Sequence, residues 1–322
     1  MAYQSSTSIA ANQNLIDAIA SFAAAVGWTV ERNTLVGANR TVTLRKPGVT
    51  DYIHIFNTDT GNVRMRASVG YDAGLAPSAQ PNVSPADTII NALTGPYPVV
   101  WFFADGDCVH VVVRRSDITG AYAHIMFGAL TKYGAYAGGT YVDGTYFGTS
   151  GGGTGAWGGD DHAPFGLGYT VTRGYLRCDA DGVSNRWFPT SASDAGTTQT
   201  HADGGVGPEG SVNMYSGGQG YSTYDITRLV YYADNNTFSG RSFLQLIQIN
   251  VPRAGSPQYV SPAGFVGNLR YVSLAKFDPE QELSIAGETW MVFPVARKAA
   301  GSSTSGAPIG TGIFGFAIRK VT

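Results

Sequence analysis

The sequence predicts a mainly β protein: antiparallel, sandwich-like sheets with one N-terminal amphipathic helix and a glycine- and aromatic-rich insertion. Three observations lead to this prediction. A single segment has helical periodicity, and several others alternate apolar and polar residues with period two. Glycine makes up 43 of the 322 residues, which supplies the turns that short strands require.

The helix is predicted within residues 9–26. Alanines there favour a helix, and large apolar side chains recur three and four residues apart, at Ile9, Leu15, Ile16, Ile19, Phe22 and Val26. Ser8 stands where it can cap the start, and Gly27 where it can cap the end. The pattern is typical of an amphipathic helix packed on a sheet.

Period-two alternation predicts strands at 41–45, 51–57 and 63–69, joined by Pro47-Gly48 and by Thr60-Gly61-Asn62. Such short connections favour an antiparallel meander. The segment 71–96 holds four prolines and is expected to be irregular.

A second hairpin is predicted from 97–103 to 108–115, turning at Asp105-Gly106-Asp107. We expect it in the central sheet with Trp101 buried. Further strands are predicted at 224–232, 243–251, 265–277, 288–295 and 312–321.

The segment 134–224 differs from the rest in composition. It carries eight acidic residues and three arginines, a net charge of −5, so the remainder carries +3. We interpret it as an insertion in, or an elaboration of, a β core made of 1–133 and 225–322. As a contact region it would use its large rings as anchors, while a mobile surface loop is the alternative. The candidate anchors are Tyr136, Tyr141, Tyr146, Phe147 and Trp157.

Motifs for chemistry are weak. Asp160, Asp161 and His162 are candidate metal ligands, since two carboxylates and an imidazole are adjacent. Asp179-Ala180-Asp181-Gly182 lacks the later ligands of a calcium loop. The pattern at 310–315 matches a dinucleotide fingerprint in letters, but a strand is predicted after it instead of a helix. We therefore predict no catalytic residues, no cofactor and no enzyme.

Charge and hydropathy exclude other classes. The formal charge is −2 without a basic run, which argues against nucleic acid as the main partner. No apolar run approaches the roughly 20 residues of a membrane span, and the start lacks the features of a secretory signal. Only 14% of residues are charged and 12% are aromatic, which suits a surface largely covered by neighbouring subunits.

Four segments, in this order, carry a family resemblance: Val26-Gly27-Trp28-Thr29-Val30 after the helix, the hairpin at 97–113, the strand at 285–294, and the closing strand at 315–320. Together they resemble a family of virion structural proteins of tailed bacteriophages, encoded among tail and baseplate genes. The resemblance covers 1–130 and 225–322, and this family carries no catalytic residues to transfer.

The resemblance implies a non-enzymatic structural subunit of the virion, assembled in the cytoplasm of a bacterial host. Its partners would be other virion proteins and copies of itself, in a symmetric homo-oligomer or ring of about three, six or twelve copies. A host surface glycan is a further expected partner if the chain is a receptor- or glycan-binding tail protein, with or without polysaccharide hydrolase activity. A capsid decoration protein is the third alternative.

Overall fold

The computed structural model describes residues 2–91, 93–116, 119–146, 164–165, 174–179, 186–190, 244–253, 259–274, 276–298 and 314–321. Within these ranges the chain forms three antiparallel sheets, one α-helix and one short 3-10 helix, Pro77–Ala79. The predicted mainly β, sandwich-like fold with an N-terminal helix is confirmed.

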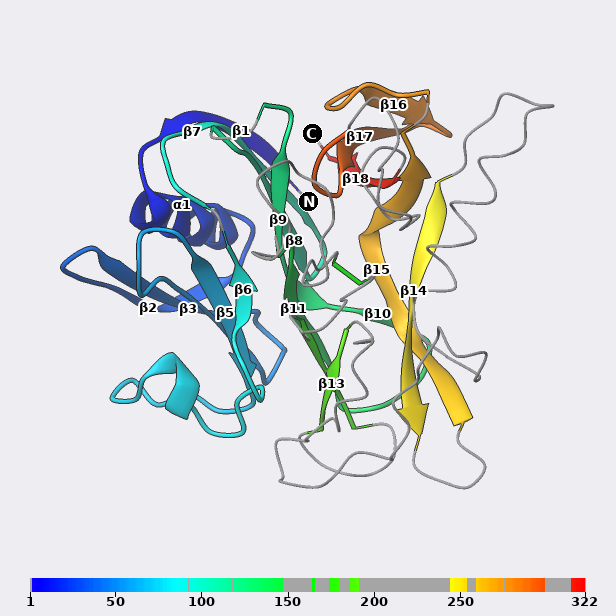
Figure 1. Cartoon of the computed structure of the whole chain (residues 1–322). Coiled ribbons are helices and arrows are strands. Elements are labelled where there is room, and N and C mark those ends of the chain that lie inside the picture. The colour runs from blue at the N-terminus through cyan, green and yellow to red at the C-terminus, as the bar shows by residue number, and fades with distance from the viewer. Residues whose placement is uncertain are drawn as a thin grey trace, which may run out of the picture.

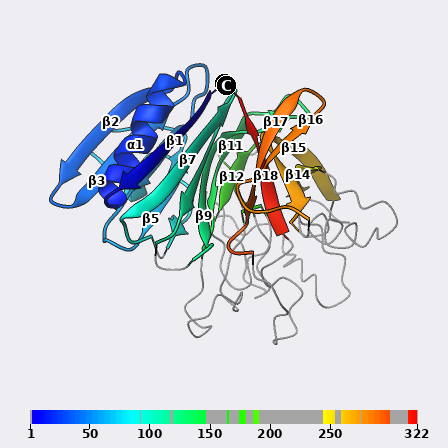
Figure 2. The same cartoon turned by 90° about the horizontal axis from the view of Figure 1, so that it is seen from above.

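The three sheets lie as adjacent layers, seen from two directions in Figures 1 and 2. The central layer is a seven-stranded sheet of β1 (Ala2–Ile9), β7 (Tyr97–Asp105), β8 (Cys108–Arg114), β9 (Tyr122–Ala129), β11 (Gly138–Gly144), β12 (Tyr175–Cys178) and β13 (Trp187–Pro189), in that order across the sheet.

The N-terminal layer is a five-stranded meander of β2 (Thr29–Val36), β3 (Asn39–Arg45), β4 (Tyr52–Phe56), β5 (Val63–Ser68) and β6 (Thr88–Ile90). The C-terminal layer is a six-stranded sheet of β10 (Thr131–Lys132), β14 (Gln245–Arg253), β15 (Tyr259–Ser273), β16 (Glu282–Ile285), β17 (Glu288–Pro294) and β18 (Phe314–Lys320). The meander predicted from 41–69 is thus present, and it extends by one strand on each side.

The central sheet is buried on both faces, which explains the nearly continuous valine run of β8. Val109, Val111 and Val113 face the core beneath the N-terminal layer, whereas Cys108 and Val112 face the core beneath the C-terminal layer. A strand covered on both sides gains from apolar residues at every position.

The hairpin β7–β8 forms as predicted, with Asp105 opposite Cys108 and Gly106 at φ +59° in the turn. Trp101 is only 5% exposed and belongs to the core between the central and C-terminal sheets. The predicted place of this hairpin and the burial of Trp101 are confirmed.

The helix α1 (Asn12–Ala25) begins later than the sequence indicates. Residues 2–9 pair with β7 as an edge strand, so Ile9 belongs to β1 and Ser8 does not cap the helix, which starts without a side-chain cap. The predicted end is confirmed: Gly27 adopts φ +89°, and the Trp28 amide donates to the Ala23 carbonyl at 2.9 Å. This bond is the one that defines a Schellman ending.

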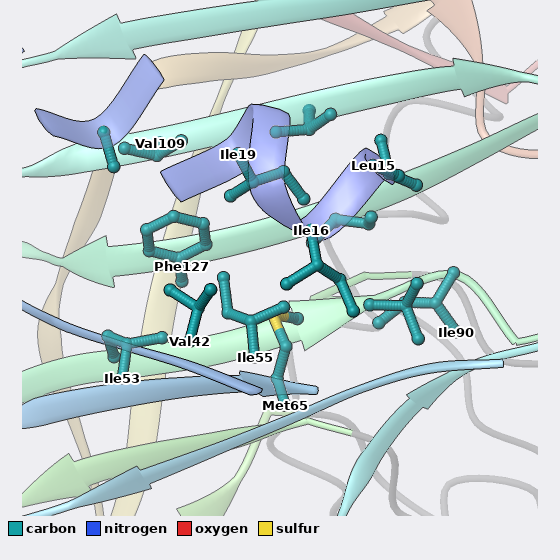
Figure 3. Packing of buried hydrophobic residues seen from close by; sticks show 14 of the residues in the cluster. Leu15, Ile16, Ile19, Val42, Ile53, Ile55, Met65, Ile90, Val109 and Phe127 are labelled. Atoms are coloured by element: carbon teal, nitrogen blue, oxygen red, sulfur yellow. The ribbon is translucent and has the colours of Figure 1, made fainter. Parts of the chain in front are cut away.

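The first core lies between α1, the five-stranded sheet and the central sheet. Figure 3 shows Leu15, Ile16 and Ile19 of the helix directed into a layer formed by side chains of the sheets. Those side chains include Val42, Ile53, Ile55, Met65, Ile90, Val109 and Phe127. Leu15, Ile16 and Ile19 are fully buried, which accounts for the periodicity that predicted the helix.

The second core lies between the central and C-terminal sheets and is rich in aromatic rings. Phe103, Tyr141, Phe293 and Phe316 are at most 1% exposed there. A smaller third cluster, which includes Val272, Trp290 and Val292, also lies on the C-terminal sheet.

Part of the segment 134–224 belongs to the central sheet. Its strands β11, β12 and β13 continue that sheet beyond β9, with Val142 opposite Phe127 and Leu176 opposite Phe188. The division of the chain into a core and an insertion stays a prediction. The strand predicted at 224–232 lies outside the described residues.

Candidate contact surface and buried polar sites

The predicted anchors occupy different environments. Tyr141 is 1% exposed, and its ring meets Phe165 edge-on at 5.1 Å in the second core. Its expected role as a contact anchor is corrected, because its ring fills the interior of the chain and is not available to a partner. Tyr146 is half-buried at the end of β11.

Tyr136 belongs to a surface group around β10, which we call the β10 aromatic group: Lys132, Tyr133, Tyr136 and Phe265. Tyr133 is 48% exposed and packs on Phe265 at 5.6 Å between ring centroids. The ammonium group of Lys132 lies 5.0 Å from the centre of the Tyr136 ring. This group combines accessible ring surface with one positive charge.

The remaining predicted residues, Phe147, Trp157, Asp160, Asp161 and His162, lie outside the described residues. Within the described part of the chain, no three histidine, cysteine or acidic side chains gather as metal ligands would. Asp179 is engaged in protein bonds: Arg177 donates to its Oδ2 at 2.7 Å, and the Arg186 amide to its Oδ1 at 3.1 Å.

A buried hydroxyl–imidazole chain crosses the five-stranded sheet. Ser68 donates its hydroxyl proton to the Gly70 carbonyl at 2.6 Å, so it accepts from His54 Nε2 at 2.7 Å. His54 Nδ1 then accepts from the Thr43 hydroxyl at 3.0 Å. Burial, with Arg32 and Arg66 nearby, lowers the pKa of His54 to about 4. This hydrogen-bonded chain resembles a catalytic nucleophile and its base only in the types of residue present. The hydroxyl proton of Ser68 points away from the imidazole, and both His54 and Ser68 are fully buried.

A second pair of imidazoles lies between the central and C-terminal sheets. His110 Nε2 is 3.0 Å from His124 Nδ1, and His124 Nε2 is 2.8 Å from the Pro294 carbonyl oxygen. Both side chains are at most 2% exposed. Burial lowers the pKa of His124 to about 4, and burial with the neighbouring His124 lowers that of His110 well below its ordinary value.

A buried ion pair joins the N-terminal layer to β12. Arg177 donates to Asp51, which immediately precedes β4, and to Asp179, with all three side chains less than 10% exposed. Burial opposes the charge of Arg177, but its bonds to Asp179 and Asp51 outweigh that effect and raise its pKa. The pair fixes β12 against the neighbouring layer.

A fourth polar cluster lies at the half-buried border of the second core, next to Trp101 and Tyr122. Arg114 donates with two nitrogens to the Glu280 carboxylate, which also accepts the Tyr122 hydroxyl at 2.6 Å. The guanidinium carbon of Arg114 lies 5.2 Å from the ring centre of Trp101. Glu280 holds φ +68°, a conformation that costs energy for a residue with a side chain. Its bonds to Arg114 and Tyr122 compensate for that cost.

The sequence places His110 within the strand predicted at 108–115 but does not reveal its partnership with His124. One signal in the sequence could have suggested it: His110 is a polar residue in an otherwise apolar strand, on the same face as Cys108 and Val112, which are both buried. What it lacked was the partner, since His124 stands 14 residues away on the next strand.

The fold defines the class of protein that the structure establishes: a layered, mainly β protein, whose described residues form three antiparallel sheets and one α-helix. A scan against protein-family models gives no match for the chain, and a search of curated proteins gives none either. Among the described residues, no helix has both the length and the apolar character needed to cross a bilayer.

Proposed function

We propose that the protein is a non-enzymatic structural subunit of a bacteriophage virion, placed in the tail or baseplate, where it provides contact surface to neighbouring proteins. The proposal starts from the resemblance of the hairpin at 97–113 and the strand at 285–294 to virion structural proteins. Both segments are core strands, so the resemblance concerns the scaffold of the fold.

The observation that carries the proposal is the use of the polar groups. In the described part of the chain, the three buried histidines and the pair of Asp51 with Arg177 bond to one another, to buried hydroxyls or to the backbone inside the protein. These groups, which chemistry would need at a surface, hold together strands within one sheet, as His54 does, or neighbouring layers, as His124 and Arg177 do. This arrangement supports a scaffold more than a catalyst.

In the described part of the chain, most of the large apolar side chains that stay exposed lie on or next to edge strands, and Leu75 lies in the loop between β5 and β6. Leu35 and Val36, at the end of the edge strand β2, are 48% and 75% exposed. Ile285, on the edge strand β16, is 43% exposed, and Tyr133 follows the edge strand β10. Edge strands with apolar side chains are suited to pairing with another chain, which supports assembly into a larger particle.

Charge supports contact between copies. The segment 134–224 has a net charge of −5 and the remainder of the chain +3, so the acidic segment of one copy can meet the basic body of the next. A closed ring of about three, six or twelve copies would satisfy such contacts around one axis. Native mass spectrometry tests this, and a strict monomer at high concentration would contradict it.

The decisive experiment is a deletion of 148–160 in the phage that encodes the chain, compared with the unmodified phage. We expect the shortened subunit to fold but to be missing from particles purified in a density gradient. Incorporation followed by failure to adsorb to the host would support receptor binding instead. Normal incorporation and normal adsorption would contradict both, and the tail position is checked by immunogold labelling of the intact particle.

The rival glycan-binding function has one observation in its favour, the β10 aromatic group. An exposed ring can stack on a sugar, and Tyr133 offers such a ring. A glycan array with the purified protein tests this function. Saturable binding that Tyr133→Ala abolishes, and Val36→Ala leaves intact, would favour the rival.

A further inference from the structure

The His110–His124 pair has no part in the proposed function, yet it occupies a central place. The two strands β8 and β9 bring these side chains together on the face of the central sheet that meets β18. The ring of Phe316 packs edge-on against both imidazoles, at 6.2 Å from His110 and 5.1 Å from His124. The pair therefore lies within the contact between two layers.

The hydrogen bonds determine which nitrogen of each ring carries the proton. A carbonyl oxygen only accepts, so the bond to Pro294 requires a proton on His124 Nε2. The neutral ring then has a bare Nδ1, which accepts the proton of His110 Nε2. His110 is neutral as well, and its own Nδ1 is left as a buried lone pair without a hydrogen-bond partner.

The backbone beside the pair joins the segment that follows β17 to the strand β9. The Tyr122 amide donates to the Ala296 carbonyl at 2.7 Å, and Ala121 forms a β-bridge with Arg297. The bond from His124 to Pro294 is part of the same connection. We call residues 294–297 the β17 exit segment.

Among the described residues, each carboxylate on the elements around the pair is already bonded to another partner and does not balance an added proton. Several charged groups on the elements packed around the pair are engaged with other partners. Asp105 pairs with Arg319, Lys320 pairs with Glu282, and Arg114 and Tyr122 bond to Glu280, while Asp143 accepts from two backbone amides. The other titratable groups there are neutral side chains: Cys108, Tyr141 and Tyr271. Burial first, and then the neighbouring His124, lower the pKa of His110.

We propose that the His110–His124 pair is an acid-sensitive contact: uptake of one proton by the pair releases the β17 exit segment from β9 and loosens the C-terminal sheet from the central sheet. A proton on His110 Nδ1 creates a donor without an acceptor and a positive charge among apolar rings. A proton on His124 Nδ1 removes the acceptor that His110 Nε2 uses. In either form the protonated imidazole is more stable in water than in the dry contact between the two sheets. Water reaches the pair only when these sheets separate.

Hydrogen exchange, read by mass spectrometry on peptides from β17 and its exit segment, tests the proposal. We expect exchange there, corrected for intrinsic rates, to rise at least ~10-fold between about pH 7 and about pH 5. The variant that removes titration is the double substitution His110→Gln and His124→Gln. The two amides can repeat the same order of bonds, from residue 110 to residue 124 and from there to Pro294.

In that double variant the rise should disappear. The matched control is His54→Gln, which removes the buried histidine of the other layer and should leave the rise at the β17 exit segment unchanged. The proposal is overturned by pH-independent exchange in the unmodified protein or by an undiminished rise in the double variant.

A measurement on the unmodified protein keeps the test valid if the double variant fails to fold. Imidazole resonances of labelled histidine, followed from about pH 7 downwards, should show no protonation of His110 or His124 while the β17 exit segment stays protected from exchange. Protonation of either ring at about pH 6 with full protection would refute the proposal, because the closed contact would then tolerate the charge.

Discussion

Trp101 offers the sharpest test of how the two layers are held together. Its ring lies 5.1 Å from that of Phe293 and 6.2 Å from that of Tyr122, under the guanidinium group of Arg114 at 5.2 Å. Replacing a buried tryptophan by alanine costs about 3–5 kcal/mol. The lost ring pairs and the cation–π contact, each worth about 0.5–1 kcal/mol, place this site in the upper part of that range. We therefore expect the free energy of unfolding to fall by about 4–5 kcal/mol in Trp101→Ala.

The assay is urea unfolding monitored by far-ultraviolet circular dichroism. The dependence of the unfolding free energy on urea concentration is compared between variants to check that they unfold in the same way. Trp101→Phe should lose only about 1–2 kcal/mol, since it keeps one ring in the site. Val36→Ala is the surface control: its side chain is 75% exposed, and a change below about 0.5 kcal/mol is expected. A loss below about 1 kcal/mol in Trp101→Ala would refute the reasoning, because the ring would then contribute little to the joined layers.

Three further predictions follow from other sites. Asp51→Asn should lower the free energy of unfolding by about 3 kcal/mol, since it breaks the buried pair with Arg177, and a urea midpoint equal to the parent's would contradict this. Ala286→Asn should raise it by about 0.5–1 kcal/mol, because Ala286 and Gly287 hold φ +50° and +81° in a type I′ turn that Asn-Gly prefers; a lower thermal midpoint would speak against it. The pKa of His54 drops from 6.5 unfolded to about 4 folded, so the unfolded chain binds the proton first and stability falls as pH decreases between these values, by up to about 3 kcal/mol. His54→Gln should make the fall in stability less steep while His110 and His124 keep their share, and an unchanged profile would exclude a contribution from His54.

Local patterns were enough to predict the helix α1 and the hairpin β7–β8. Their signals are contained in short stretches: a spacing of three and four residues around Leu15 and Ile19, and two strands joined by a turn at Gly106. The end of α1 at Gly27 was equally local, because the ending needs a residue that tolerates positive φ. These elements depend on residues close together in the chain.

The edge strand β1 could not be predicted in this way. Its sequence is polar, and it becomes a strand because the Tyr97–Asp105 edge of the central sheet offers it a partner about 90 residues away. The contact anchors show the same limit: nothing in the sequence distinguishes Tyr141, which is buried, from Tyr136, which reaches the surface.

The sequence by itself determined that this is a mainly β protein with one helix, because strand and helix periodicities are properties of neighbouring residues. Only the tertiary structure decided that the central sheet is covered on both faces. Because of that cover, His110 is buried and forms a pair with His124. The physical reason is that alternation tells which residues share a face but not what lies against that face. The covering layer comes from strands far along the chain, and only their packing sets the environment of each side chain.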